Sequence, residues 1–219
     1  MEEQRPSVLK PAIDPSLDMT DSDLFWQEHW RKVVWGLAVL VALILLVGVW
    51  NLWSAQTQRS AESLFSTAAG PEGWREVVQQ FPASVVAGNA QMRLADVLRG
   101  EGNLDGAAAE LEAMVASQPD HPLAGAAWLT LGEIRQVQGS KEAALEAFRT
   151  ASSRHKESYA APLALIAEAS LLQADGSTGE ARAVLQSVGS LHPGTPAAMV
   201  AEGELGRLGA AAEPASPTP

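Results

Sequence analysis

The sequence has no cysteine, few aromatic residues and more acidic than basic side chains. Without cysteine the chain cannot form disulfides, use a thiol nucleophile, hold an iron–sulfur cluster through thiolates or carry a lipoprotein acyl group. Aromatic residues make up 5% of the chain, with one Tyr and four Phe, which disfavours a sheet-rich fold. The formal net charge of −11 argues against nucleic-acid binding, because phosphates require a basic face.

Apolar residues still form 47% of the 219 residues, enough for one modest domain with appendages. Ala, Leu and Glu are abundant, and all three favour helices. We therefore expect an all-α fold.

One apolar run sets the class of protein. Residues 33–53 carry no charge, and as a helix they would span about 31 Å, close to the hydrocarbon thickness of a bilayer. Trp30 and Trp35 lie near one end, and Trp50 and Trp53 near the other, where indole rings favour the headgroup region. A buried core helix is the alternative, but the rest of the chain is too small to bury one. We predict a transmembrane helix in contact with the lipid bilayer.

The flanks of this run predict a signal anchor and its orientation. The leader and the apolar run are both too long for a cleavable signal peptide, and Ser54-Ala55 is a poor cleavage site. Arg31 and Lys32 abut the N-terminal end, whereas only Arg59 follows closely on the other side. We expect a single pass through the inner (cytoplasmic) membrane, with a cytoplasmic N-terminus and a periplasmic or otherwise extracytoplasmic C-terminal domain.

The ends of the chain have a different character. Residues 1–20, with three prolines and few large apolar groups, predict a disordered cytoplasmic leader. Capping residues from Thr20 to Asp23 predict a juxtamembrane helix over 21–32. Residues 195–208 predict a capping helix with Pro196 in its first turn, and 210–219 predict a disordered tail.

The region between has a period of 37 residues. The members in phase are Gly102, Gly139 and Gly176; Ala107, Ala144 and Ala181; Leu111, Phe148 and Leu185; and Pro82, Pro119 and Pro193, with Lys156 where a further proline would fall. Self-similarity at this spacing indicates stacked helical repeats.

Each repeat unit is predicted to be an antiparallel helix pair. In the middle unit Gly139 ends the first helix as a left-handed stop, and Ser140 or Lys141 begins the second. Small residues allow the helices to approach, and Phe148 fills the gap. Further units run from about 84 to 119 and from 158 to 193, after a half-unit of two helices over 56–69 and 74–81. In the third unit Glu168 replaces the leucine expected in the first helix.

The pattern resembles the tetratricopeptide repeat (TPR). The residues that match in type and spacing are Trp128, Leu131, Gly132, Gly139, Ala144, Phe148 and Ala151. The resemblance implies a TPR-like α-solenoid of about three and a half helix-pair repeats over 54–209, after the transmembrane helix and before a C-terminal capping helix. The period exceeds the usual 34 residues, and the extra residues near Asp120 to Leu123 are expected to loosen the stacking.

The layout also resembles a narrower group, the membrane-anchored ancillary translocon subunit and cell-division coordinator TPR family (YfgM-like proteins). The resemblance rests on the architecture and on Ala61, Trp74, Phe81 and Pro82 after the span. It implies a membrane-anchored adaptor that binds proteins of the bacterial envelope, among them exported clients near the secretion translocon. The alternative is a constitutive structural subunit of a division, cytochrome-maturation or outer-membrane assembly complex.

The TPR resemblance also implies a protein-binding groove, because first helices line the concave side of such solenoids. Its expected residues are Asn89, Met92, Asp96 and Arg99; Leu129, Glu133 and Gln136; and Leu163, Ile166, Ser170 and Gln173. This mixture of apolar and polar groups suits an extended peptide or a helix of a membrane or exported protein. For any one of these residues, an ordinary solvated or inter-helix position is the competing interpretation.

No catalytic pattern accompanies these repeats. The four histidines have no ligand spacing, so we expect no metal, and no phosphate loop or nucleophile elbow predicts a cofactor or an enzyme. Residues 54–219 hold 11 Lys or Arg and 19 Asp or Glu, a net charge of −8. Such a domain is repelled by anionic headgroups.

Overall fold

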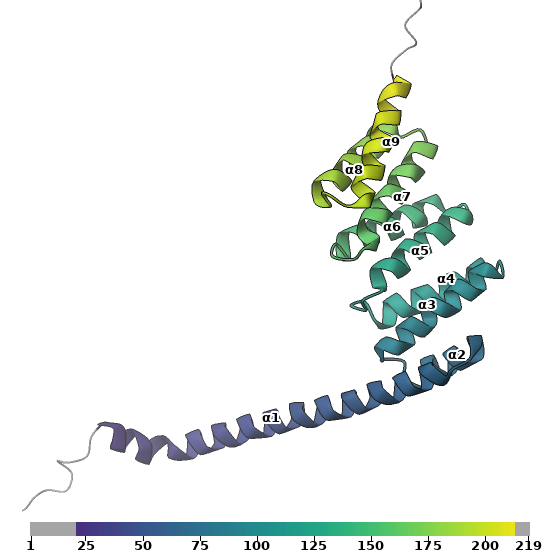
Figure 1. Cartoon of the computed structure of the whole chain (residues 1–219). Helices are drawn as coiled ribbons and strands as arrows, with labels where there is room; N and C mark the ends of the chain where they lie inside the picture. Colours follow the sequence, from purple (N-terminus) through teal and green to yellow (C-terminus); the bar gives the residue numbers. More distant parts are fainter. Residues whose placement is uncertain (1–20, 213–219) are drawn as a thin grey trace, which may run out of the picture. The chain divides into compact units, whose positions relative to one another are not determined.

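The structure is a computed structural model that describes residues 21–212. These residues form nine α-helices and no strand (Figure 1). The helices are α1 (Asp21–Thr67), α2 (Gly70–Gln80), α3 (Val85–Gly100), α4 (Leu104–Ser117), α5 (Ala124–Val137), α6 (Lys141–Arg154), α7 (Ala160–Ala174), α8 (Thr178–Leu191) and α9 (Pro196–Ala212). The all-helical prediction is confirmed. The chain divides into two compact units, Met1–Ala55 and Gln56–Pro219.

The first unit is described from residue 21 and consists of the N-terminal part of α1. From residue 30 to residue 53 its side chains are exposed, among them the large apolar ones. An 18-residue window of α1 has a mean hydropathy of 2.8 and no buried residue, so the helix is long and apolar enough to cross a membrane. The predicted leader, 1–20, lies outside the described residues.

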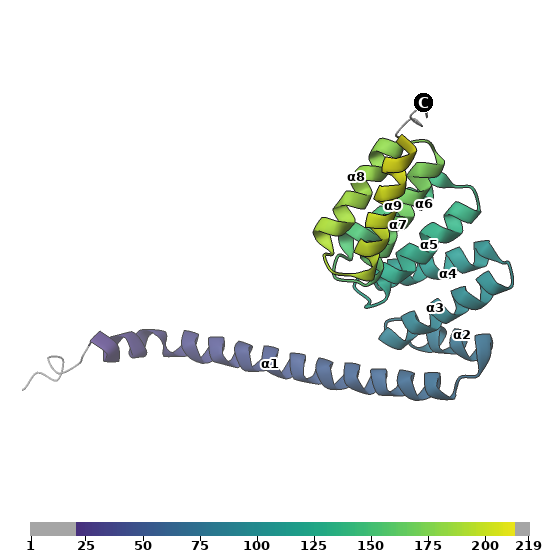
Figure 2. The ribbon, with the colours of Figure 1, turned by 45° about the horizontal axis from the view of Figure 1, so that its top comes forward.

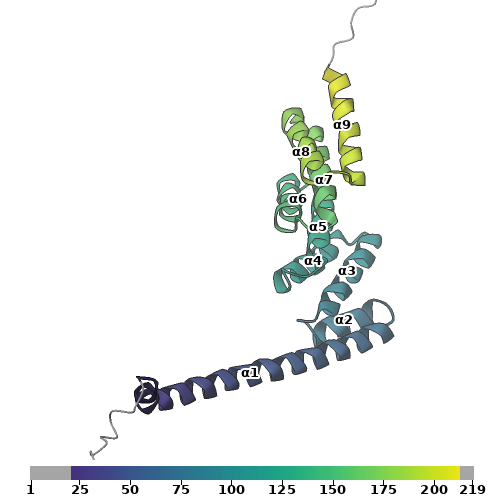
Figure 3. The same cartoon turned by 60° about the vertical axis from the view of Figure 1, so that its left-hand side comes forward.

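The second unit is a stack of antiparallel helix pairs (Figures 1 to 3). The C-terminal turns of α1 pair with α2, and the pairs α3/α4, α5/α6 and α7/α8 follow, with α9 packed on α7 and α8. Helix α9 runs to Ala212, beyond the 195–208 expected for the capping helix and into the first residues of the expected tail. Residues 213–219 lie outside the described part.

Glycine ends the first helix of each complete pair. Gly102, Gly139 and Gly176 have φ values of 79°, 77° and 80°, a region that glycine enters without steric cost. The residue after each glycine donates its backbone N–H to a carbonyl five residues back, as Asn103 does to Leu98 at 2.8 Å. The left-handed helix stops predicted from the sequence are therefore confirmed.

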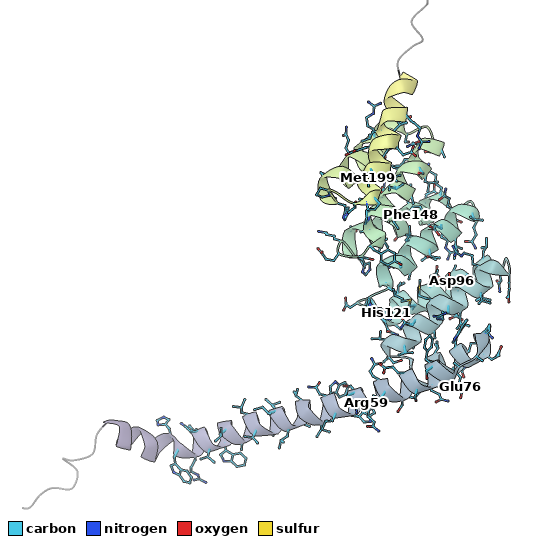
Figure 4. All side chains as sticks on the ribbon, in the orientation of Figure 1. Arg59, Glu76, Asp96, His121, Phe148 and Met199 are labelled. Atoms are coloured by element: carbon cyan, nitrogen blue, oxygen red, sulfur yellow. The ribbon has the colours of Figure 1, made fainter. Side chains whose placement is uncertain are left out.

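The core between paired helices depends on small residues facing a large one. Phe148 of α6 is completely buried within the stack (Figure 4). A Cβ placed on Gly132 of α5 would overlap the Phe148 ring, so only glycine permits this helix spacing. In the third unit Glu168 is buried at 5% exposure and accepts a hydrogen bond from Arg149 Nε at 2.7 Å. The carboxylate that replaces the expected leucine is thus paired across α6 and α7.

The loop between α4 and α5 is held firmly to the preceding unit. His121 is buried, its Nδ1 accepts the Leu123 N–H at 3.0 Å, and its Nε2 lies 2.8 Å from the Val85 carbonyl oxygen. The proton therefore belongs on Nε2, which donates to Val85. The imidazole therefore ties the loop around Asp120 to Leu123 to α3.

Candidate protein-interaction surface

The eleven residues expected to line a groove come from the first helices of three pairs. They lie on α3 (Asn89, Met92, Asp96, Arg99), α5 (Leu129, Glu133, Gln136) and α7 (Leu163, Ile166, Ser170, Gln173). None of them is buried, although each of these helices has a buried face. We call their exposed side chains the first-helix surface.

The structure brings three of these residues together. The Arg99 guanidinium lies 3.4 Å from an Asp96 carboxylate oxygen on the same helix and 3.5 Å from Glu133 on α5. All three side chains are about half exposed, so the ion pairs contribute little stability. They show that side chains of successive first helices share one polar surface.

Three expected apolar groove residues belong partly to the core. Met92 packs on the cluster around Leu111, Leu129 on the cluster around Phe148, and Ile166 on the cluster around Leu185. Each therefore presents only part of its side chain to a partner.

The surface becomes more apolar toward the C-terminal end of the stack. Leu163 is 43% exposed and Tyr159, just before α7, is 67% exposed, while Val200 of α9 is 50% exposed. The 37-residue period places Val200 at the position equivalent to Leu163 in the next unit. Tyr159 and Val200 are absent from the predicted groove, and the same period could have identified Val200.

Another group at the N-terminal end was not predicted from the sequence. The Arg93 guanidinium lies 5.8 Å from the Phe65 ring centroid and 5.7 Å from that of Trp74, within cation–π range. Arg93 is one helical turn beyond the predicted Asn89, so helical spacing could have identified it.

A hollow of about 550 Å³ opens beside this group. Its lining consists of Gln58, Glu62 and Phe65 from α1 and Val85, Val86 and Asn89 from α3. The Gln58 amide oxygen is buried and has no hydrogen-bond partner among the described residues. A segment bound here could donate a hydrogen bond to it.

Among the described residues, no three His, Asp or Glu side chains lie close enough to hold a metal ion. His121 is committed to two backbone hydrogen bonds, and the charged groups of the stack form ion pairs or face solvent. The arrangement can bind a protein segment through apolar, amide and charged groups.

A solenoid of helix pairs with an open first-helix surface defines a class of protein that binds other proteins. The family described as "Tetratricopeptide repeat-like domain" matches residues 24–201. The chain therefore belongs to this tetratricopeptide repeat-like family, as its motif residues predicted. Repeats of this kind imply a role in protein–protein interaction, and the fold is typically a non-catalytic scaffold.

Solved structures of low sequence identity are similar to this chain. A crystal structure of MamA is 18% identical with a TM-score of 0.50, and the match covers 64% of this chain and 75% of that one. A putative kinesin light chain with TPR-like repeats from Podosopora anserina is 20% identical with a TM-score of 0.47, covering 72% of this chain and 85% of that one. No curated protein matches the chain.

Proposed function

We propose that this protein is a membrane-anchored adaptor that binds envelope proteins through its first-helix surface. The observation that carries the proposal is that all eleven predicted residues remain accessible on three successive first helices. An extended peptide or partner helix could contact them together, with polar groups near Arg99 and apolar groups near Leu163.

The anchor supplies the second part of the proposal. Residues 33–53 would hold the domain at the inner membrane, with the N-terminus in the cytoplasm and the repeats outside it. Confinement at a membrane raises the effective concentration of the binding surface for partners in the same bilayer. The layout of one span followed directly by repeats, which resembles the YfgM-like group, favours membrane or exported clients near the secretion translocon.

A constitutive structural subunit of an envelope complex is the second candidate. The exposed side chains of Tyr159, Leu163 and Val200 favour it, because large apolar side chains left exposed on a domain can be covered in a permanent interface. A single partner at fixed stoichiometry would distinguish this role from client binding.

Site-specific photocrosslinking in cells tests the proposal. A photoreactive residue at Leu129 on α5 is compared with one at Glu142, an exposed position on the second helix α6. Many partners at Leu129 only, with translocon components or exported chains among them, would support the adaptor. One dominant partner at Leu129 would favour the structural subunit. Equal crosslinking from both positions would overturn the assignment of the surface.

A further inference from the structure

A second hollow lies away from the first-helix surface, where α6 and α8 end. Its volume is about 540 Å³, within the range of small-ligand pockets. Leu165 of α7 and Leu191 of α8 supply its apolar lining, and Ser153, Lys156, Glu157 and His192 contribute polar groups. Leu165 is 9% exposed and Leu191 is 66% exposed, so one side chain closes the hollow and the other borders its mouth.

The preceding unit shows what kind of side chain fits this position. Trp128 of α5 is the equivalent of Leu165 by the 37-residue period. Its indole ring packs against the core clusters on both sides, one around Leu111 and one around Phe148. Leucine is smaller than tryptophan and leaves the corresponding volume of the third unit open. The fold itself therefore places an aromatic ring at this position one unit earlier.

The charged groups of the lining indicate which side chain would stand next to such a ring in a bound segment. Lys156 is exposed in the lining and makes no ion pair with any residue that the structure describes. Lys156 also stands where the other units have proline. Within the lining the charges of Lys156 and Glu157 balance. The Lys156 ammonium is the group that can pair with a carboxylate.

We propose that this hollow binds an aromatic side chain of a partner protein segment, with a neighbouring carboxylate of that segment paired to Lys156. The aromatic ring would take the place in the third unit that Trp128 fills in the second. The binding site lies at the loop edge of the solenoid, so it is independent of the first-helix surface and of the crosslinking outcome at Leu129.

The minimal probe for this site is N-acetyl-L-tryptophan, which joins an indole to a carboxylate. The full chain, with labelled leucine methyl groups, is studied by NMR in phospholipid nanodiscs. Saturable shifts are expected at Leu165 and Leu191, and the shift at Leu191 should disappear in Leu165→Trp, in which the new ring fills the hollow. Retained circular dichroism shows that this variant is folded. Leu191→Ser is the second variant, because Leu191 is exposed and its loss leaves the core intact.

Two comparisons separate the ring from the charge. Lys156→Glu should weaken N-acetyl-L-tryptophan about two- to five-fold, the range of an exposed ion pair. The same variant should leave N-acetyl-L-tryptophanamide, which has no carboxylate, unchanged. The proposal is overturned by the absence of saturable shifts at the two leucines, by shifts that persist in both Leu165→Trp and Leu191→Ser, or by equal binding of N-acetylglycine. An unchanged affinity in Lys156→Glu overturns the role of the carboxylate.

Discussion

The α5/α6 and α7/α8 pairs have the same fold, but different side chains fill the space between their helices. Along a 37-residue offset, Gly132 and Phe148 of the middle pair correspond to Ala169 and Leu185 of the third. In the middle pair a large ring occupies space left by a missing side chain. In the third pair a small alanine and a medium-sized leucine share one core cluster. The summed volume of the two side chains is similar in both pairs, although both residues differ.

This comparison shows that the repeats preserve the fit between two contacting side chains, and not the identity of the residue at each single position. Each unit contacts mainly its neighbours, so a change is tolerated when its contact partner changes with it. Glu168 illustrates the same rule, because a buried carboxylate replaces Leu131 where Arg149 can reach it. Where no partner compensates, as at Leu165, a hollow remains.

The largest effect is expected from Gly132→Ala. Alanine has a better helix propensity by about 1 kcal/mol. The added Cβ would nevertheless overlap the fully buried Phe148 ring so closely that the cost lies at the upper end of the about 1–3 kcal/mol typical of overpacking. We expect a net loss of stability, measured as a lower urea midpoint of the full chain in detergent micelles.

The matched control introduces the residues of the third pair at the equivalent positions of the middle pair. In a Gly132→Ala, Phe148→Leu double variant the pair becomes that of Ala169 and Leu185. The two losses should then be less than additive, with a coupling energy of about 0.5–3 kcal/mol. Strict additivity would show that the pairwise comparison between units is wrong.

A smaller effect is expected from Arg149→Ala in the third pair. The substitution leaves the Glu168 carboxylate buried without its partner. Arg149 itself is 56% exposed, so solvent already screens the pair, and we expect a loss of about 1–2 kcal/mol in the same urea titration.

Glu168→Leu, which restores the residue of the middle unit, provides the control. Replacing a buried charge by an apolar side chain of similar size is often neutral or stabilising. In that background Arg149→Ala should have no measurable effect on stability. A loss of similar size in both backgrounds would mean that Arg149 acts through packing and not through Glu168.

The sequence was sufficient to predict the features that repeat. Helix periodicity and the glycine stops at a 37-residue spacing predicted the helix pairs, and the motif around Trp128 predicted the family. These features are local or recur in every unit, so one chain contains several copies of the signal. The residues assigned to the first-helix surface remain a prediction, although all of them are accessible.

The features that the sequence did not predict are contacts between units. The Glu168–Arg149 pair joins residues on different helices, and the Arg93 stack joins α3 to Phe65 and Trp74. The hollow beside Leu165 depends on three separate segments that meet only in the folded stack. No local pattern marks such sites, because each partner alone has the composition of an ordinary surface or core residue.

The smallest effect is expected in the loops between units, at the position that His121 occupies. Ser84, His121, Ser158 and Thr195 are equivalent by the 37-residue period, and each accepts a backbone N–H at the start of a helix. His121→Ser should keep this cap but lose the bond from Nε2 to Val85 and the packing of the ring near Gly88. Loss of the hydrogen bond alone costs about 1 kcal/mol.

Gly88→Ala tests whether the imidazole also sets the spacing of α3. A Cβ at Gly88 would lie 2.7 Å from the His121 ring, so this substitution should destabilise the native chain. In the His121→Ser background the ring is absent, and the same alanine should stabilise the protein by up to about 1 kcal/mol through helix propensity. The measurement is the urea midpoint of the native chain, of Gly88→Ala, of His121→Ser and of the double variant. A destabilising Gly88→Ala in both backgrounds would show that something other than the imidazole requires the glycine.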